Sequence, residues 1–181
     1  MKKAFCLLLA LLLMAAAQLH LCARVSVDGE ELPDKLSLSA LFCAREAAAA
    51  AADEILTTDG APPGVETRWC LSLSPPSQDA APLSDLLLRH TEGVAVLYSG
   101  SVDGFPVACV SDRERLCEAL RRQLYANRPA GAIHARYAEP IDVRPLYTRP
   151  DRESSVEDAC LWITGMSRAL YTDEDGRLIA G

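Results

Sequence analysis

Two stretches of the chain alternate between apolar and polar residues, which is the pattern of a strand with one buried face. In residues 65–73 the odd-numbered side chains, from Val65 to Leu73, form the predicted buried face, and the even-numbered ones are mostly polar. Residues 132–148 alternate in the same way, with interruptions at Pro140 and Pro145 that suit an edge or bulged strand. Both stretches are therefore predicted to be half-buried strands with one solvated face.

Four other stretches have the composition or spacing of helices. Residues 40–56 are rich in alanine, a strong helix former, and Ser39 is the predicted cap. Ser111 and Glu114 form a predicted capping box for a second helix. Two shorter helices are predicted in residues 81–93 and 154–166, the latter capped by Ser155. The apolar stripes are Leu116, Cys117, Leu120 and Leu124 in the second helix, and Val156, Ala159, Cys160 and Ile163 in the last.

The tripeptide Val-Asp-Gly occurs twice, at residues 27–29 and 102–104, and Asp-Gly returns at residues 175–176. Asp-Gly between β-rich arms is a strong hairpin signal, because a type I′ turn needs positive φ at both central residues. A helix, a strand and a short helix follow each of the first two hairpins. We interpret this order as a repeated unit of about 73 residues, although Asp-Gly is also a common turn that could align by chance.

The predicted fold class is α+β: two related ββαβα repeats after an N-terminal export or anchor helix. Repeat 1 covers residues 24–93, repeat 2 covers residues 94–167, and residues 168–181 are a partial third hairpin or a tail. Residues 1–23 are a signal peptide or a membrane anchor, since Lys2 and Lys3 precede an apolar run and small residues follow it. The run is short for a bilayer span, which favours cleavage over retention.

Charge and cysteine content narrow the function classes. The net charge is −7, and it becomes −9 if Lys2 and Lys3 leave with the export segment. An acidic chain argues against nucleic acid and against adsorption to anionic lipid, so any membrane contact is expected through the N-terminal segment alone. No CxxC motif is present, and the seven cysteines lack the regular spacing of a stapled miniprotein. Most of them are predicted to be small buried hydrophobes rather than bridges.

Isolated histidines and cysteines are the candidates for catalytic residues. The sharpest enzyme hypothesis pairs Cys109 or Cys117, as nucleophile, with His134 as base. Cys109 is predicted in a hairpin arm and Cys117 on the apolar face of a helix, and both are poor positions for a nucleophile. His134 is predicted on the polar face of a strand, where a solvated histidine is the simpler interpretation. His90 is assigned a structural role at a helix C-terminus. We expect no enzyme, and no catalytic, cofactor-binding or metal-ligating residue; the predicted interaction residues are the hairpin tips Asp28, Gly29, Asp103 and Gly104.

The Val-Asp-Gly hairpin, the segment EPIDVRPLYTRPD and the following SSVEDA together resemble the extracytoplasmic repeats of Firmicute cell-wall proteins. In that family the repeats precede LysM, G5-type and lysostaphin-like metallopeptidase domains, none of which is visible here. The resemblance is best over residues 83–165. It implies an exported, non-catalytic envelope module, secreted or membrane-anchored, that acts as a spacer or protein-interaction domain near the peptidoglycan. Its expected partners are cell-wall or envelope proteins. The alternatives are a small secreted wall hydrolase or thiol enzyme, and an N-terminal fragment of a larger wall peptidase.

Overall fold

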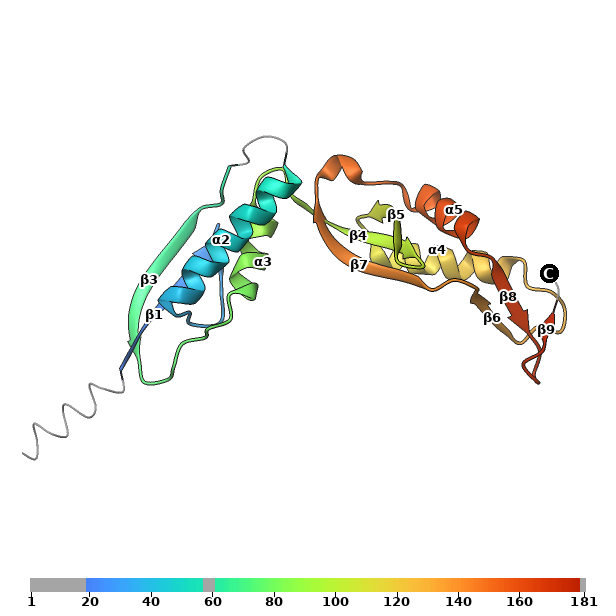
Figure 1. The fold of residues 1–181 in the computed structure, drawn as a ribbon, viewed down its shortest axis with the longest axis horizontal. Coiled ribbons are helices and arrows are strands. Elements are labelled where there is room, and N and C mark those ends of the chain that lie inside the picture. The colour runs from blue at the N-terminus through green and yellow to red at the C-terminus, as the bar shows by residue number, and fades with distance from the viewer. Residues whose placement is uncertain (1–18, 57–60, 180–181) are drawn as a thin grey trace, which may run out of the picture. The chain divides into compact units, whose positions relative to one another are not determined.

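The computed structural model describes residues 19–56 and 61–179. These residues form a mixed α+β protein with four α-helices and three antiparallel sheets of three strands each, which confirms the α+β class. The chain divides into two compact units, residues 1–94 and 95–181 (Figure 1).

The first unit contains one sheet and two helices. Its elements are β1 (His20–Val27), β2 (Glu30–Glu31), α2 (Leu38–Ile55), β3 (Val65–Ser72) and α3 (Ala81–His90), and the strand order is β2-β1-β3. Strand β1 begins inside the predicted export segment, so residues 20–23 form a strand and not the end of a helix. The rest of that predicted segment, residues 1–18, lies outside the described residues.

Helices α2 and α3 pack beside one another on the buried face of β1. That face presents Ala23, Val25 and Val27, each at most 1% exposed. The helices contribute Ala40, Leu41, Ala44, Ala48, Leu83, Leu86 and Leu87 to this core. The predicted cap Ser39 is wrong: Ser37 Oγ accepts from the Ala40 N–H at 3.1 Å, because the helix begins two residues earlier than its apolar pattern indicates.

The second unit has the same opening elements and an additional small sheet. Its elements are β4 (Ala95–Val102), β5 (Phe105–Val110), α4 (Arg113–Ala126), β6 (His134–Tyr137), β7 (Ile141–Thr148), the 3₁₀ turn η1 (Pro150–Arg152), α5 (Val156–Met166), β8 (Ala169–Thr172) and β9 (Leu178–Ile179). The sheets have the orders β5-β4-β7 and β6-β8-β9. The alternating stretch 132–148 is therefore divided between two sheets. The division falls where the Ala138 N–H donates to Arg168 O at 2.9 Å, just before Pro140.

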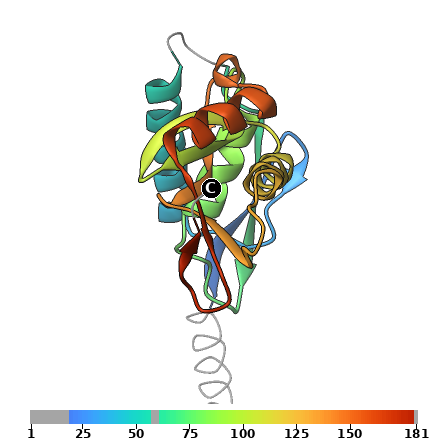
Figure 2. The same ribbon diagram turned by 90° about the vertical axis from the view of Figure 1, so that its right-hand side faces the viewer.

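The core of the second unit joins sheet β5-β4-β7 to both of its long helices. Helix α4, seen nearly end-on in Figure 2, and helix α5 both contribute to it. The buried members are Val102, Ala108, Val110, Leu116, Leu120, Ala159 and Ile163, and Val156 and Cys160 pack against them. The apolar stripe predicted for α5 is thus confirmed. The stripe predicted for α4 is confirmed at its three leucines and wrong at Cys117, which is exposed.

Capping in the second unit agrees with the sequence at one helix and differs at the other. Ser155 caps α5, accepting from the Asp158 N–H at 3.0 Å, as predicted. Helix α4 is capped by Asp112 and not by Ser111; Asp112 Oδ1 accepts from the Arg115 N–H at 2.9 Å. Ser and Asp are both strong caps, so the sequence does not distinguish two that are adjacent.

Two tyrosines attach the small sheet β6-β8-β9 to the end of α4. Tyr171 of β8 donates its hydroxyl to Leu124 O at 3.0 Å, and Tyr137 of β6 donates to Leu120 O at 2.7 Å. Leu124 O is among the last four carbonyls of α4, which lack a partner within the helix. Strand β8 also pairs with β9, so the described part of residues 168–181 is a hairpin joined to β6 and not a free tail.

The Tyr137 contact predicts a loss of stability at high pH. Burial, with smaller contributions from Cys160 and Tyr171, raises the pKa of Tyr137 to about 12, from 10.0. The neutral phenol therefore contributes fully to the free energy of unfolding below pH 10. This contribution is lost as the pH rises through 12. We expect the midpoint of thermal unfolding to fall over this range in the wild type, and to fall less in Tyr137→Phe. Tyr125→Phe, at an exposed position of α4, is the control; an equal fall in all three proteins would contradict the assignment.

Candidate functional site

Strand β3 forms an edge of the first sheet, and half of its backbone groups point away from β1. The Asp28 N–H donates to Gly64 O at 2.9 Å, one step beyond the paired residues Val27 and Val65. Hydrogen-bonded residues alternate along an antiparallel pair. The even-numbered residues 66–72 therefore bond to β1, and residues 65, 67, 69 and 71 direct their N–H and C=O groups outward, where an additional strand could pair.

The corresponding edges of the second unit are obstructed. On β7 the same alternation, set by the Asp103 N–H donating to Pro140 O at 2.9 Å, directs residue 145 outward. This residue is Pro145, which has no N–H to offer, and proline on an edge strand hinders strand addition. The other edge, β5, is partly covered because the Ser154 N–H donates to Cys109 O at 2.7 Å. Strand β3 is thus the more open template for a partner strand.

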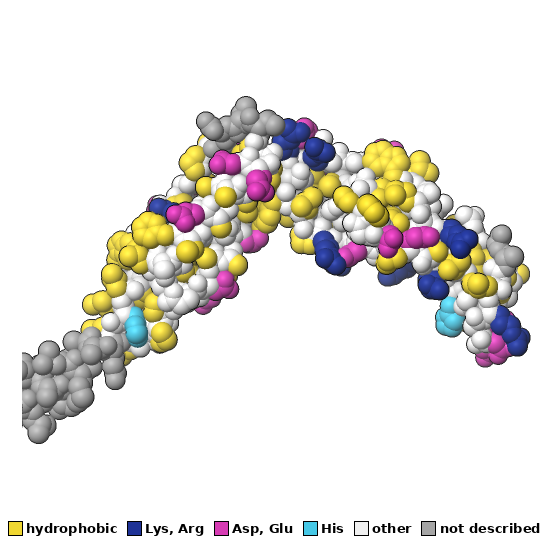
Figure 3. Space-filling view, in the orientation of Figure 1, with side chains coloured by type: hydrophobic (Ala, Val, Ile, Leu, Met, Phe, Trp, Pro, Cys, Tyr) yellow, Lys and Arg dark blue, Asp and Glu magenta, His cyan; other side chains and the backbone are white. Residues whose placement is uncertain are grey.

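Large apolar side chains are exposed along the open strand. Trp69 is 51% exposed and Leu71 is 63% exposed. Leu19, Leu21 and Leu73 are exposed nearby, since Leu21 and Leu71 are register partners in β1 and β3. Figure 3 shows hydrophobic side chains along this flank of the first unit. The predicted buried face of residues 65–73 is therefore wrong at its second half, because α2 and α3 cover β1 more completely than the edge strand. We call Leu21, Trp69, Leu71 and Leu73 the β3 patch.

The predicted hairpin tips adopt the expected turn geometry. Asp28 and Asp103 have φ values of 49° and 50°, and Gly29 and Gly104 have φ values of 89° and 79°. Asp28 Oδ1 accepts from the Gly64 N–H at 2.9 Å. The Asp103 N–H donates to Pro140 O at 2.9 Å. These residues shape the two hairpins, and their role in binding a partner stays a prediction.

His90, the last residue of α3, fixes the first hairpin. Its Nδ1 lies 3.5 Å from Asp28 Oδ2, and its Nε2 lies 3.1 Å from Glu30 Oε2. The structural role predicted from its position at a helix end is retained, and the structure adds these two carboxylate partners from β1–β2. Sequence spacing could not have revealed them, because residues 28 and 90 come together only in the folded unit.

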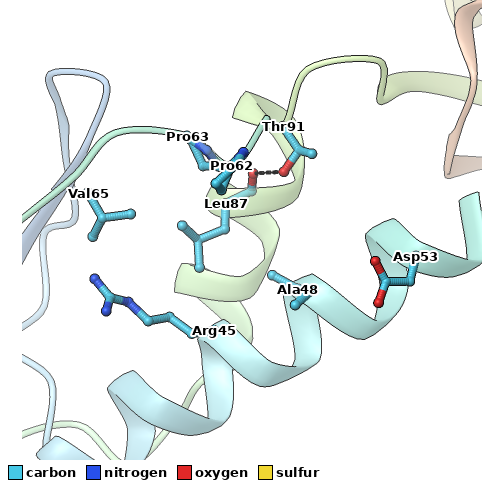
Figure 4. Close-up of a pocket in the computed structure, with 9 residues that line it drawn as sticks. Arg45, Ala48, Asp53, Pro62, Pro63, Val65, Leu87 and Thr91 are labelled. Atoms are coloured by element: carbon cyan, nitrogen blue, oxygen red, sulfur yellow. Dashed lines mark hydrogen bonds between the residues drawn. The ribbon is translucent and has the colours of Figure 1, made fainter. Parts of the chain in front are cut away.

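A cavity of about 530 Å³ opens between α2, α3 and the start of β3 (Figure 4). Its charged lining residues are Arg45 and Asp53, both on α2. Its apolar walls are formed by Pro62, Pro63, Val65 and Leu87. Thr91 Oγ1, at its rim, donates to Leu87 O at 2.8 Å. The lining residues include no cysteine, histidine or serine.

The residues of the enzyme hypothesis lie on separate elements. Cys109 is on β5, Cys117 on α4 and His134 on β6, and within the described residues no hydrogen bond joins His134 to either sulfur. The prediction that most cysteines are buried is wrong: of the six described, Cys22 is buried, Cys70, Cys109 and Cys160 are half-buried, and Cys43 and Cys117 are exposed. Burial raises the pKa of the Cys160 thiol, and the nearby Glu157 adds to the shift.

Across residues 19–56 and 61–179, no group of three or more His, Cys, Asp and Glu side chains is arranged to hold a metal ion. Among the helices in the same part of the chain, none combines the length and the apolar character needed to cross a bilayer. Comparisons of the chain with protein-family models, with curated proteins and with solved structures found no match.

Proposed function

We propose that this protein is an exported, non-catalytic module of the cell envelope, built from two related ββαβα repeats, that binds an extended segment of another envelope protein. The observation that carries the proposal is the open edge of β3 with its exposed apolar side chains. An extended peptide that adds to such an edge gains backbone hydrogen bonds, and its alternate side chains can contact the β3 patch.

The spacing of the elements supports the duplication. Strands β1 and β4 are both eight residues long and begin 75 residues apart, and the starts of α2 and α4, and of α3 and α5, are also 75 residues apart. The hairpin strand order is the same, β2-β1-β3 and β5-β4-β7. The same offset of 75 residues separates the two Val-Asp-Gly tripeptides, and it is two residues more than the unit length of about 73 expected from the sequence. The second unit adds the sheet β6-β8-β9, which has no counterpart among the described residues of the first unit.

The order of residues at the N-terminus supports export. Two lysines, an apolar run and small residues precede β1, which is the order of a signal peptide. A strand that begins at His20 is consistent with a folded part that starts soon after cleavage near Ala17. The acidic balance and the resemblance to extracytoplasmic wall repeats favour protein partners near the peptidoglycan over nucleic acid.

Thr67→Pro is expected to weaken partner binding by about fivefold, because it removes an outward N–H worth about 1 kcal/mol in a paired strand. A photo-reactive residue at position 71 would report binding in intact cells as a discrete cross-linked species. Thr67→Val, which keeps the N–H and the β-branched shape, is the matched control and should cross-link like the wild type.

The folding of Thr67→Pro is checked by thermal unfolding of the purified chain, so that a loss of cross-linking is not a loss of structure. Cross-linking of folded Thr67→Pro at the wild-type level would contradict binding through β3. Export is tested with a protease added to cells whose outer surface is permeable and whose cytoplasmic membrane is intact. Protection of the chain from this protease would contradict export.

A further inference from the structure

Cys22 and Cys70 face one another across the two main strands of the first sheet. They are register partners in β1 and β3, and their sulfur atoms are 3.6 Å apart. Cys22 Sγ also lies 3.3 Å from Cys70 O. Directly opposed residues in an antiparallel pair have Cα atoms about 4.5–5.5 Å apart, which falls within the range of about 4.4–6.8 Å found for disulfides.

We propose that Cys22 and Cys70 are a disulfide site, and that an organic disulfide, such as oxidised glutathione or the active disulfide of a thiol oxidase, converts them into a cross-link between β1 and β3. A disulfide bond is about 2.0 Å long. The two sulfurs must therefore approach by about 1.5 Å, which small rotations of both side chains can provide. The inference goes beyond the proposed function and does not depend on it.

The accessibility of the two thiols indicates the order of the exchange. Cys70 is half-buried, and Cys22 is fully buried. Cys70 can therefore attack the donor disulfide first, which forms a mixed disulfide and releases one donor thiol. Cys22 then attacks the Cys70 sulfur, which forms the cross-link and releases the second donor thiol. Two protein thiols are oxidised, one donor disulfide is reduced, and the two protein thiol protons end on the released thiols.

The pKa of Cys22 agrees with this order. Burial raises the pKa of the Cys22 thiol, the hydrogen bond and charge of Cys70 raise it further, and Lys35 and Arg24 act in the opposite direction. A thiol that stays protonated near neutral pH is a poor first nucleophile. Cys22 is therefore suited to the second, intramolecular step, where its sulfur is already in contact with the target.

The second unit places leucines at the corresponding positions. Leu97 and Leu146 are register partners in β4 and β7, and they repeat the pattern of one buried and one more exposed side chain. The position is thus a cross-strand register pair in both units, apolar in the second unit and formed by two thiols in the first. Among the described cysteines, Cys22 and Cys70 are the pair whose sulfurs are in contact.

The test uses the full chain, reduced and then equilibrated with oxidised glutathione. Free thiols are alkylated, and the protein is digested and analysed by mass spectrometry. We expect a peptide pair linked through Cys22 and Cys70, and loss of these two thiols from alkylation, in the wild type and in Cys43→Ser and Cys117→Ser. In Cys22→Ala the second step is blocked, so Cys70 should accumulate as its glutathione mixed disulfide.

Two results would overturn the proposal. One is a wild-type chain in which Cys22 and Cys70 remain fully alkylated after equilibration. The other is a chain in which Cys70 pairs with Cys43 or Cys117 as readily as with Cys22. If Cys22→Ala does not fold, Cys70→Ala provides the second variant: it should leave Cys22 reduced, since the thiol that starts the exchange is absent.

Discussion

Replacing Ile163 with alanine is expected to destabilise the second unit by about 2–5 kcal/mol. Ile163 on α5 is fully buried, and it lies in the core formed with Leu116 of α4 and the sheet β5-β4-β7. Truncation removes apolar contacts and leaves a cavity that well-packed neighbours fill only in part. Because α5 is joined to the sheet through this residue and Ala159, the loss affects the docking of the whole helix.

Denaturant unfolding followed by tryptophan fluorescence measures this effect. The chain has two tryptophans, Trp69 in the first unit and Trp162 on α5, so a Trp69→Phe background reports the second unit alone. Leu161→Ala, on the same helix at an exposed position, is the control and should change stability by less than about 0.5 kcal/mol. Similar losses for Ile163→Ala and Leu161→Ala would contradict the packing described here.

Gly100→Ala is expected to destabilise the same unit by about 1–3 kcal/mol. A Cβ at position 100 would lie 2.7 Å from Ile163 Cδ1 and 3.6 Å from Leu116 Cδ2. The first distance is too short for two carbon atoms, so Ile163 would have to move within a dense core. A glycine in the middle of β4 would normally weaken a strand; here it makes room for α5.

A double-mutant cycle isolates the cause of the Gly100 effect. Ile163→Val removes the Cδ1 atom that the new Cβ would meet, so Gly100→Ala should be much less harmful in that background. Gly165→Ala is the matched glycine control, because nothing lies within 4 Å of its added Cβ and the residue is in α5. It should stabilise the protein by about 0.5–1 kcal/mol. Equal losses for Gly100→Ala in both backgrounds would contradict the proposed clash.

The two proposals act on the same sheet in different ways. A disulfide between β1 and β3 would hold the edge strand in place, and an extended partner would pair with its other side. In the chain-entropy account, cross-links that close long loops stabilise a fold by about 3–5 kcal/mol. The disulfide is therefore expected to hold β3 in place. It would not touch a bound partner, because the partner pairs with the opposite side of β3. Cross-linking from position 71 is compared in the wild type and in Cys70→Ala, which cannot form the disulfide. The comparison separates partner binding at β3 from the effect of the disulfide.

Local patterns were sufficient for the hairpins and for most helices. Asp-Gly at residues 28–29 and 103–104 specified turns with positive φ, because few other dipeptides adopt that conformation without strain. The apolar spacing of 156–163 specified the buried side of α5, since a helix presents residues three and four apart on one face. Capping was less certain, as Ser37 and Asp112 show, because a neighbouring Ser or Asp satisfies the same local rule.

Long-range contacts decided the features on which the two proposals rest. Alternation in 132–148 indicated strand structure, but pairing of β6 with β8 and of β7 with β4 is set by residues far along the chain. The exposure of Trp69 and Leu71 depends on how far α2 and α3 extend over the edge strand. The alternating pattern placed Cys70 on the polar face of its strand. Only the register of β1 against β3 brings it opposite Cys22.

The sequence by itself determined the α+β class, the positions of the two hairpins and the amphipathic helices, because these follow from turn chemistry and from periodicities within a few residues. Only the tertiary structure decided which strand edge is open, which apolar side chains remain exposed and which thiols meet. Those properties depend on which distant segments cover or face one another, and no local pattern encodes that.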